Sequence, residues 1–163
     1  MHYSGIIPAD VANGPGVRVS LFVSGCRRGC KGCFNQEAWD FNYGKEFTYE
    51  TISEIDRLLD NPNIAGLSIL GGDPFEPENQ EAVEDLCAYV RKYFPGKSIW
   101  AWTGFLYEDV KNTELIKYID ILVDGPFVQE LKDLRLKYRG SSNQRIINVR
   151  ESLIEGYTEE LEE

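Results

Sequence analysis

The sequence predicts an α/β protein with an open, mainly parallel β-sheet, and three observations support this prediction. Runs of β-branched and aromatic residues alternate with helical patterns of roughly 10 to 16 residues, an order typical of βαβ units. The most unusual residues directly follow these runs, where the active sites of parallel sheets lie. The chain has 163 residues, fewer than the roughly 200 to 250 of a closed eightfold barrel. We therefore expect about five to six strands in a partial barrel or a doubly wound sheet.

The first expected strand and helix lie on either side of a cysteine-rich loop. Residues 17–23 are rich in Val, Leu and Phe and end at a Ser-Gly pair, which predicts a strand. The helix begins near Thr48 or Thr51, where Thr51 and Glu54 fit a capping box, and it ends before an Asn-Pro pair. The further expected elements are a strand at 66–70, a helix at 77–93, a strand at 98–102, a helix at 108–117, a strand at 119–123 and a strand at 145–149.

Composition and charge argue against several classes of protein. The chain has 27 acidic and 17 basic residues and a net charge of −10, so binding of nucleic acid through bulk electrostatics is not expected. No apolar run approaches the roughly 20 residues that a membrane span needs. The opening residues 1–5 lack the basic and apolar regions of an export signal. We expect a soluble, cytoplasmic protein that binds neither nucleic acid nor membrane.

The acid excess is concentrated at the C-terminus. Residues 151–163 hold six acidic residues and no basic residue, so residues 1–150 carry only −4 of the net charge of −10. Apolar residues at helical spacing permit an amphipathic helix in this segment, but glutamates at its C-terminal end oppose the helix dipole. We predict a single domain at 1–150 and an acidic tail at 151–163 that is mobile or solubilising.

Three of the four cysteines are close together in the sequence. Cys26, Cys30 and Cys33 have the spacing C-x3-C-x2-C, whereas Cys87 lies on the apolar face of an expected helix, where we expect it to be part of the core. In an intracellular chain such a cluster favours metal or redox chemistry over disulfides. Because His2 is the single histidine, catalysis by a histidine base is not expected.

Three cysteine ligands suit a metal centre with one open position. Glycines in the loop permit a tight turn that points three thiolates at one centre. Closed structural zinc sites and ferredoxin clusters take four ligands, whereas a [4Fe–4S] cluster on three cysteines leaves one iron open. Arg27, Arg28 and Lys31 would offset the negative charge of such a cluster. The alternatives are a zinc site completed by Cys87 or His2, or simply buried thiols.

Residues 26–33 resemble the iron–sulfur signature of radical S-adenosylmethionine (radical SAM) enzymes. In the wider superfamily the residue before the third cysteine is aromatic, whereas here it is Gly32 and Phe34 follows the cysteine. The proteins that activate anaerobic ribonucleoside-triphosphate reductases share this departure, and the chain resembles them from residue 13 to about 147. The motifs that carry this resemblance are Asn13-Gly14-Pro15-Gly16-Val17-Arg18, Leu21-Phe22-Val23-Ser24-Gly25-Cys26, Gly32-Cys33-Phe34-Asn35, Gly71-Gly72-Asp73-Pro74, Trp100-Ala101-Trp102-Thr103-Gly104, Val123-Asp124-Gly125-Pro126-Phe127 and Arg139-Gly140-Ser141-Ser142-Asn143-Gln144-Arg145.

The resemblance implies a fold, two cofactors and a reaction. The fold is the open partial (β/α) barrel of the radical SAM type, and Cys26, Cys30 and Cys33 hold a [4Fe–4S] cluster whose open iron binds SAM. Reductive cleavage of SAM gives a 5′-deoxyadenosyl radical, which generates a glycyl radical on the large subunit of the reductase. No side chain is implied as a catalytic group beyond the cluster and SAM. Reduced flavodoxin is the electron donor that the resemblance suggests.

The resemblance also implies contacts to SAM. Three residues of the cysteine loop would face the adenine, and Asn35 would reach the ribose or cap the next helix. The Gly-Gly-Asp turn would hold the amino group, although it also fits an ordinary βα turn. Thr103 and Asp124 would face the carboxylate of SAM or a cation, or serve only turn geometry. The residues concerned are Gly32, Cys33, Phe34, Asn35, Gly71, Gly72, Asp73, Thr103 and Asp124.

Two questions stay open at this stage. Residues 134–149 carry four basic residues and no acidic one, so this segment docks the reductase or an electron donor, contacts SAM, or is a solvated loop. The alternative functions are a radical SAM enzyme that acts on another glycyl radical enzyme or on a small molecule and, in a different class, a zinc-binding interaction module without catalysis.

Overall fold

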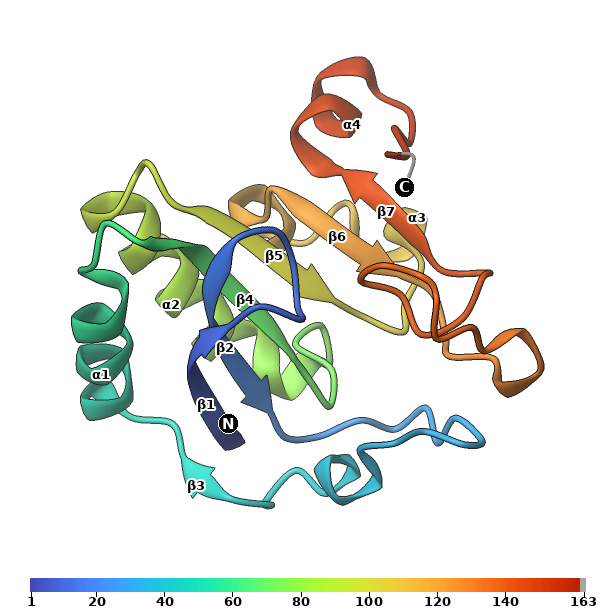
Figure 1. Cartoon of the computed structure of the whole chain (residues 1–163), viewed down its shortest axis with the longest axis horizontal. Coiled ribbons are helices and arrows are strands. Elements are labelled where there is room, and N and C mark those ends of the chain that lie inside the picture. The colour runs from blue at the N-terminus through green and yellow to red at the C-terminus, as the bar shows by residue number, and fades with distance from the viewer. Residues whose placement is uncertain (162–163) are drawn as a thin grey trace.

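The protein, described by a computed structural model over residues 1–161, is built on one mixed β-sheet. The sheet has seven strands in the order β3-β1-β2-β4-β5-β6-β7, and its outermost strands do not pair with each other, so it stays open. Figure 1 shows the sheet with its helices. The strands are β1 (His2–Asp10), β2 (Val17–Val23), β3 (Lys45–Glu46), β4 (Ile64–Gly71), β5 (Ser98–Trp102), β6 (Ile121–Asp124) and β7 (Arg145–Asn148).

The central four strands confirm the predicted parallel α/β core. β2, β4, β5 and β6 are parallel neighbours in chain order, whereas β1 runs antiparallel to β2 and β7 runs antiparallel to β6. The expected number of five to six strands is wrong, because β1 and β3 also join the sheet. β1 contains Gly5 and Pro8 and has little apolar alternation, so only its pairing with β2 reveals it as a strand.

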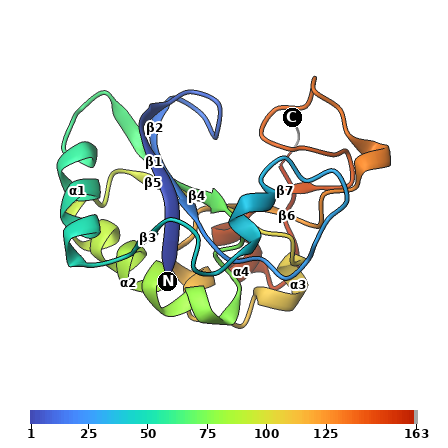
Figure 2. The same ribbon diagram turned by 90° about the horizontal axis from the view of Figure 1, so that it is seen from below.

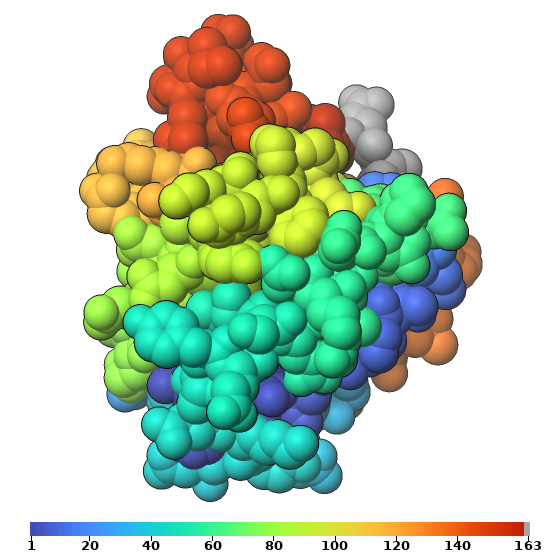
Figure 3. Space-filling view, turned by 90° about the vertical axis from the view of Figure 1, so that its left-hand side faces the viewer, coloured from blue at the N-terminus to red at the C-terminus, as the bar shows by residue number. Residues whose placement is uncertain are grey.

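The helices cover one face of the sheet, as the view from below shows (Figure 2). Their apolar side chains pack on the strand residues that point to this face, and the fully buried Cys87 of α2 is part of this core, as predicted. In the space-filling view of Figure 3, residues in and around α1 and α2 cover much of the side that faces the viewer. The helices are α1 (Tyr49–Leu59), α2 (Pro77–Tyr93), α3 (Tyr107–Val110) and α4 (Val149–Glu155), with short 3₁₀ turns at η1 (Gln36–Trp39), η2 (Leu115–Tyr118) and η3 (Gln129–Leu131).

Two of the helices differ from the sequence prediction in detail. Thr48 caps α1, and Thr51 rather than Glu54 completes its capping box. The helix expected at 108–117 is divided into α3 and η2, because the Thr113 hydroxyl donates to the Val110 carbonyl and accepts from the Ile116 N–H, which ends the regular helical pattern. Within residues 1–161 no helix has both the length and the apolar character needed to cross a membrane.

The end of the described chain packs on the last strand. α4 begins at Val149 and ends at Glu155, and its C-cap residue Gly156 adopts a left-handed conformation with φ of 81°. The segment after it pairs with β7, since the Asn148 N–H donates to the Glu159 carbonyl and the Leu161 N–H donates to the Ile146 carbonyl. The helix therefore runs across the boundary predicted at residue 150, and part of the acidic tail covers the edge of the sheet.

A buried arginine organises the sheet face opposite to the helices. Arg18 of β2 is fully buried, and its guanidinium donates to the hydroxyls of Ser68 and Ser98 and to three backbone carbonyls. Burial lowers the pKa of Arg18 to about 10. Gly66 of β4 leaves room for this side chain, because a Cβ there would lie 2.7 Å from the Arg18 Nη2 atom. Arg18 thus joins three parallel strands through neutral oxygens.

Arg18→Lys tests this network. A lysine ammonium keeps the charge but has fewer donors and no planar fork, so it cannot reach both hydroxyls and the carbonyls. We expect the free energy of unfolding to fall by about 2–4 kcal/mol, measured by urea titration of the cluster-free protein. Arg57→Lys, on the exposed side of α1, is the control and should change stability by less than about 0.5 kcal/mol. Equal effects of the two substitutions would contradict the role given to Arg18.

Candidate functional site

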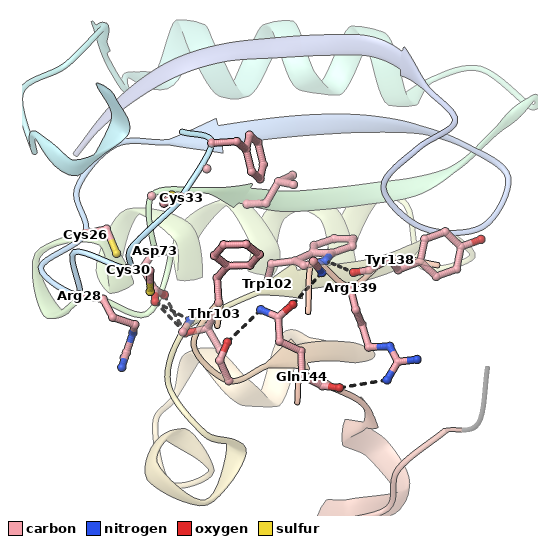
Figure 4. A pocket seen from close by; sticks show the side chains of 18 of the residues that line it. Cys26, Arg28, Cys30, Cys33, Asp73, Trp102, Thr103, Tyr138, Arg139 and Gln144 are labelled. Carbon is pink, nitrogen blue, oxygen red and sulfur yellow. Dashed lines mark hydrogen bonds between the residues drawn. The ribbon is translucent and has the colours of Figure 1, made fainter. Parts of the chain in front are cut away.

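A cavity of about 510 Å³ opens at the carboxyl ends of the parallel strands. Its walls come from the cysteine loop that follows β2, from the turns that follow β4 and β5, and from the long segment between β6 and β7. In Figure 4 the cysteines and Asp73 lie at one end of this pocket and Tyr138 and Arg139 at the other. The predicted gathering of unusual residues at this edge is therefore confirmed for most of them.

The three clustered cysteines share this cavity. Cys26, Cys30 and Cys33 all line it, all are free thiols, and all are partly exposed. Gly29 and Gly32 have positive φ values of 63° and 77°, which lets the loop turn between the cysteines. Across residues 1–161, no three His, Cys, Asp or Glu side chains already converge on one metal position. The three thiols thus border one cavity, but they do not surround a common metal position.

The turn after β4 is pressed against the start of the cysteine loop. Gly71 has a φ of 115°, and a Cβ on Gly72 would lie 2.6 Å from the Gly25 carbonyl oxygen. The Gly72 N–H donates to the Val23 carbonyl and the Asp73 N–H to the Gly25 carbonyl, at 2.7 and 2.8 Å. The glycines at 71 and 72 therefore permit close backbone packing between two loops. Gly71, Gly72 and Asp73 all line the cavity, as expected.

Asp73 joins this turn to the next strand. Its buried carboxylate accepts hydrogen bonds from the Thr103 hydroxyl at 2.8 and 3.0 Å, from the Gly104 N–H at 2.9 Å and from the Phe75 N–H at 2.9 Å. Burial raises the pKa of Asp73 to about 6, although these hydrogen bonds oppose the shift. Asp73 does not cap α2, whose N-cap residue is Glu76. Asp73 and Thr103 therefore form one unit in the cavity wall.

The cysteine thiols differ in their electrostatic surroundings. Burial raises the pKa of Cys26, and the nearby carboxylates of Asp73 and Glu76 raise it further, while the Arg28 backbone N–H lowers it. Full burial raises the pKa of Cys87 to about 12, which keeps this thiol protonated and inert.

His2 lies in β1 and not at a frayed end, as its backbone carbonyl accepts the Ser24 N–H.

Two of the residues expected to contact SAM, Asp124 and Asn35, do not line the cavity. Asp124 is fully buried, and its carboxylate accepts from the Tyr107 N–H and pairs with Arg145 at 2.6 Å, so it supports the start of α3. Asn35 is the N-cap residue of η1 without a side-chain cap bond and does not line the cavity. Gly32, Phe34 and Thr103 do line it, and 91% of the Phe34 side chain is exposed.

The positive charge of the basic segment, residues 134–149, is partly neutralised within the protein. Arg145 pairs with Asp124 and Glu108, and Arg135 pairs with Asp133, just outside the acid-free run. Arg139 lines the cavity and donates to the Gln144 carbonyl. Two of the four basic residues are therefore paired with carboxylates of the protein itself, so the net positive charge of the segment overstates what a partner would encounter.

Several residues of the cavity wall were not predicted as site residues from the sequence. They come from alternate positions of the strands and from the segment between β6 and β7. On β2, β4 and β5, residues that alternate with the helix-facing core point to this side, and this period-2 pattern was the available signal. Of the loop residues, Phe127 and Gln144 stand in motifs that carry the family resemblance but were given no role, whereas Tyr138 lies outside those motifs. The missed wall residues include Phe22, Leu70, Trp102, Phe127, Tyr138 and Gln144.

The cysteine loop has the donor chemistry that an iron–sulfur cluster requires. Thiolates are the ligands of such clusters, and three free thiols on one glycine-containing loop border one cavity. The residues that would hold the cluster are Cys26, Cys30 and Cys33.

Comparisons with known proteins agree with this site. A family model described as a 4Fe-4S single cluster domain matches residues 12–147. An anaerobic ribonucleoside-triphosphate reductase-activating protein of Enterobacteria phage T4 is 44% identical over 146 residues, which cover 90% of this chain and 93% of the phage protein. The same-named protein of Vibrio cholerae is 45% identical over 90% of this chain and 97% of its own length. That of Escherichia coli K12 is 42% identical over 92% of this chain and 100% of its own length.

These matches span nearly the whole chain and include the cysteine loop, the turn after β4 and the turn after β5. The resemblance seen in the sequence motifs is therefore confirmed. This chain belongs to the family of anaerobic ribonucleoside-triphosphate reductase-activating proteins and contains their 4Fe-4S single cluster domain.

Proposed function

We propose that this protein is a radical SAM enzyme that activates an anaerobic ribonucleoside-triphosphate reductase in the cytoplasm. When bound at the three cysteines, the cluster would supply an electron that cleaves the C–S bond of SAM, and the resulting 5′-deoxyadenosyl radical would take a hydrogen atom from a glycine of the reductase. Methionine and 5′-deoxyadenosine would be the products. The observation that carries the proposal is that all three clustered thiols border a single cavity at the carboxyl edge of the sheet.

The cavity suits a ligand of the size of SAM. Its volume of about 510 Å³ lies within the range of roughly 300–1,000 Å³ typical of small-molecule sites. We propose that the Gly71-Gly72-Asp73 turn lies against the SAM amino group, where the Asp73 carboxylate would favour a positive charge. Phe34 and Trp102 offer apolar surface for the adenine.

The arrangement of the fold supports a protein substrate. Four parallel strands with helices on one face agree with an open partial barrel of the radical SAM type. The cavity lies between the cysteine loop and the segment from β6 to β7, and Phe34 and Leu134, which line it, are 91% and 89% exposed. We infer that the reductase completes the enclosure of the radical by covering this opening. An external donor, reduced flavodoxin in our proposal, would supply the electron.

The central prediction concerns radical formation. Anaerobically reconstituted protein, mixed with SAM, reductant and the purified reductase, should give the EPR signal of a glycyl radical on the reductase. Alanine at Cys26, Cys30 or Cys33 should abolish cluster binding and this signal, because each substitution removes an iron ligand. Cys87→Ala is the matched control, since this fourth thiol is buried in the helical core, and it should retain the brown cluster and the signal.

Three results would count against the proposal in different ways. SAM cleavage without a glycyl radical on this reductase would favour a different glycyl radical enzyme or a small-molecule substrate. A colourless protein with one bound zinc, unaffected by Cys26→Ala in any redox assay, would favour the interaction module. Loss of activity in Cys87→Ala with a normally folded protein would contradict the ligand assignment.

Thr103→Val tests the unit formed by Asp73 and Thr103. The substitution keeps the shape of the side chain but removes the hydroxyl that donates to the buried carboxylate. We expect the free energy of unfolding of the cluster-free protein to fall by about 1–3 kcal/mol, measured in urea, and SAM to bind more weakly to the reconstituted protein. Thr113→Val is the control: its hydroxyl donates to a backbone carbonyl outside the cavity. If Thr103→Val bound SAM as tightly as the wild-type protein, the unit formed by Asp73 and Thr103 would not be part of the SAM site.

A further inference from the structure

The two halves of the cysteine loop are held very differently by the rest of the protein. The backbone N–H groups of four consecutive residues at its start all donate hydrogen bonds to other segments. Their acceptors lie on β1, in η1, and on the turn that leads into α2. The bonds are Ser24 to the His2 carbonyl at 2.9 Å, Gly25 to the Ala38 carbonyl at 2.7 Å, Cys26 to the Trp39 carbonyl at 3.2 Å and Arg27 to the Glu76 Oε2 atom at 2.6 Å.

The second half of the loop has no such anchors. Within the described part of the chain, nothing accepts a hydrogen bond from the N–H groups of residues 29–32. The Cys33 N–H donates at 3.2 Å to Cys30, inside the loop itself. The Arg28 guanidinium stacks over the Phe105 ring at 4.8 Å, which is its contact to the turn after β5. Cys26 therefore lies on a segment that backbone hydrogen bonds attach to the fold. Cys30 and Cys33 lie on a segment without such bonds, where Gly32 packs against the Gln129 side chain.

Among the four anchors, Glu76 is the one supplied by a side chain. It is only 5% exposed, although it is a charged residue. Its second carboxylate oxygen lies 3.5 Å from the Arg27 Nη1 atom. The neighbouring Asn79 donates to the Ser24 and Asp73 carbonyls, both at 3.0 Å. The first turn of α2 and the residue that caps it thus hold both ends of the segment 24–27.

A buried carboxylate in this position needs an explanation, because burial of a charge is unfavourable unless hydrogen bonds compensate for it. Glu76 accepts the short bond from the Arg27 N–H and faces the Arg27 guanidinium, whose other partner is the exposed Glu78. An N–H group at residue 27 that lost this acceptor would be left without a partner in a partly buried place. Glu76 therefore fixes the backbone directly after Cys26.

We propose that Glu76 is a positioning residue that holds Cys26 as the preplaced ligand, around which Cys30 and Cys33 close when the cluster binds. The inference rests on the proposed function, because it assumes a cluster on these cysteines. A loop with one ligand fixed has less conformational freedom to lose on binding than a loop with three mobile ligands. The free second half, in turn, lets two thiols adjust to the cluster.

Hydrogen exchange of the cluster-free protein tests the anchoring directly. Measured by mass spectrometry with fragmentation to single residues, the N–H groups of residues 24–27 should exchange at least about tenfold more slowly than those of residues 29–32. Glu76→Ala should accelerate exchange at Arg27 and leave the central strand β4 unchanged. Equal exchange in the two halves of the wild-type loop would overturn the inference.

Cluster retention tests the consequence for iron. After anaerobic reconstitution, iron release to bathophenanthroline disulfonate should be about tenfold faster in Glu76→Ala than in wild type, as expected from the loss of one hydrogen bond to a charged group. Glu76→Gln should stay within about threefold of wild type, because its amide oxygen can still accept the Arg27 N–H. Glu78→Ala is the matched control and should release iron at the wild-type rate.

The outcomes separate this inference from the proposed function. A wild-type protein that takes up no cluster overturns the proposed function, and the inference with it. A wild-type cluster that Glu76→Ala releases no faster, or a Glu76→Gln variant as impaired as Glu76→Ala, overturns the inference alone. Urea unfolding of each cluster-free variant accompanies the assay, and rapid release in a variant with wild-type stability and altered cluster EPR supports positioning over general destabilisation.

Discussion

The packing of the Gly71-Gly72 turn against the start of the cysteine loop is the contact on which the site depends. Any side chain at Gly72 would collide with the backbone at Gly25, so two loops from neighbouring parallel strands meet without intervening side chains. The residue that follows, Asp73, extends the contact to a third strand through Thr103. One short turn thereby joins β2, β4 and β5 at the edge where the cysteines lie.

The electrostatics of the site follow from this packing. Burial raises the pKa of Cys26, and two carboxylates buried beside the cysteine loop, Asp73 and Glu76, raise it further. Arg27 and Arg28 of the loop supply the opposite charge. Each carboxylate accepts hydrogen bonds that compensate for its burial. Both buried carboxylates beside the cysteine loop therefore already have hydrogen-bond donors within the protein. Further along the chain, the ion pair with Arg145 likewise compensates for the burial of the Asp124 carboxylate.

The cysteine loop combines a rigid and an adaptable part. Its first residues are hydrogen-bonded to three other segments, and its later residues turn through two glycines without backbone hydrogen bonds to the rest of the protein. Such a division suits a loop that must stay attached to the sheet while its thiols reach a bound group. The helical face of the sheet, in contrast, is a conventional apolar core that includes Cys87. The fourth cysteine thus differs from the other three in surroundings as well as in sequence position.

The local sequence patterns predicted the parts of the fold that carry their own signal. The apolar run of β4, the helical periodicity of α2 and its proline at the first position determined these elements, since burial of one face requires such spacing. β1 and β3 escaped prediction because their pairing partners, rather than their own residues, make them strands. The continuous helix expected at 108–117 does not form, because the Thr113 hydroxyl donates a hydrogen bond to the Val110 carbonyl and interrupts the helical pattern.

The site shows the same division. The cysteine spacing, and the positions of Gly71, Asp73 and Thr103 at or just after the ends of strands, were sufficient to place these residues at one cavity. Parallel strands present their carboxyl ends at one edge of a sheet. Only the tertiary structure decided that Asp124 turns away to Arg145 and that Glu76 holds the cysteine loop. Residue order determines which groups reach an edge of the sheet. Which partner each buried charge finds there depends on neighbours that are distant in the sequence.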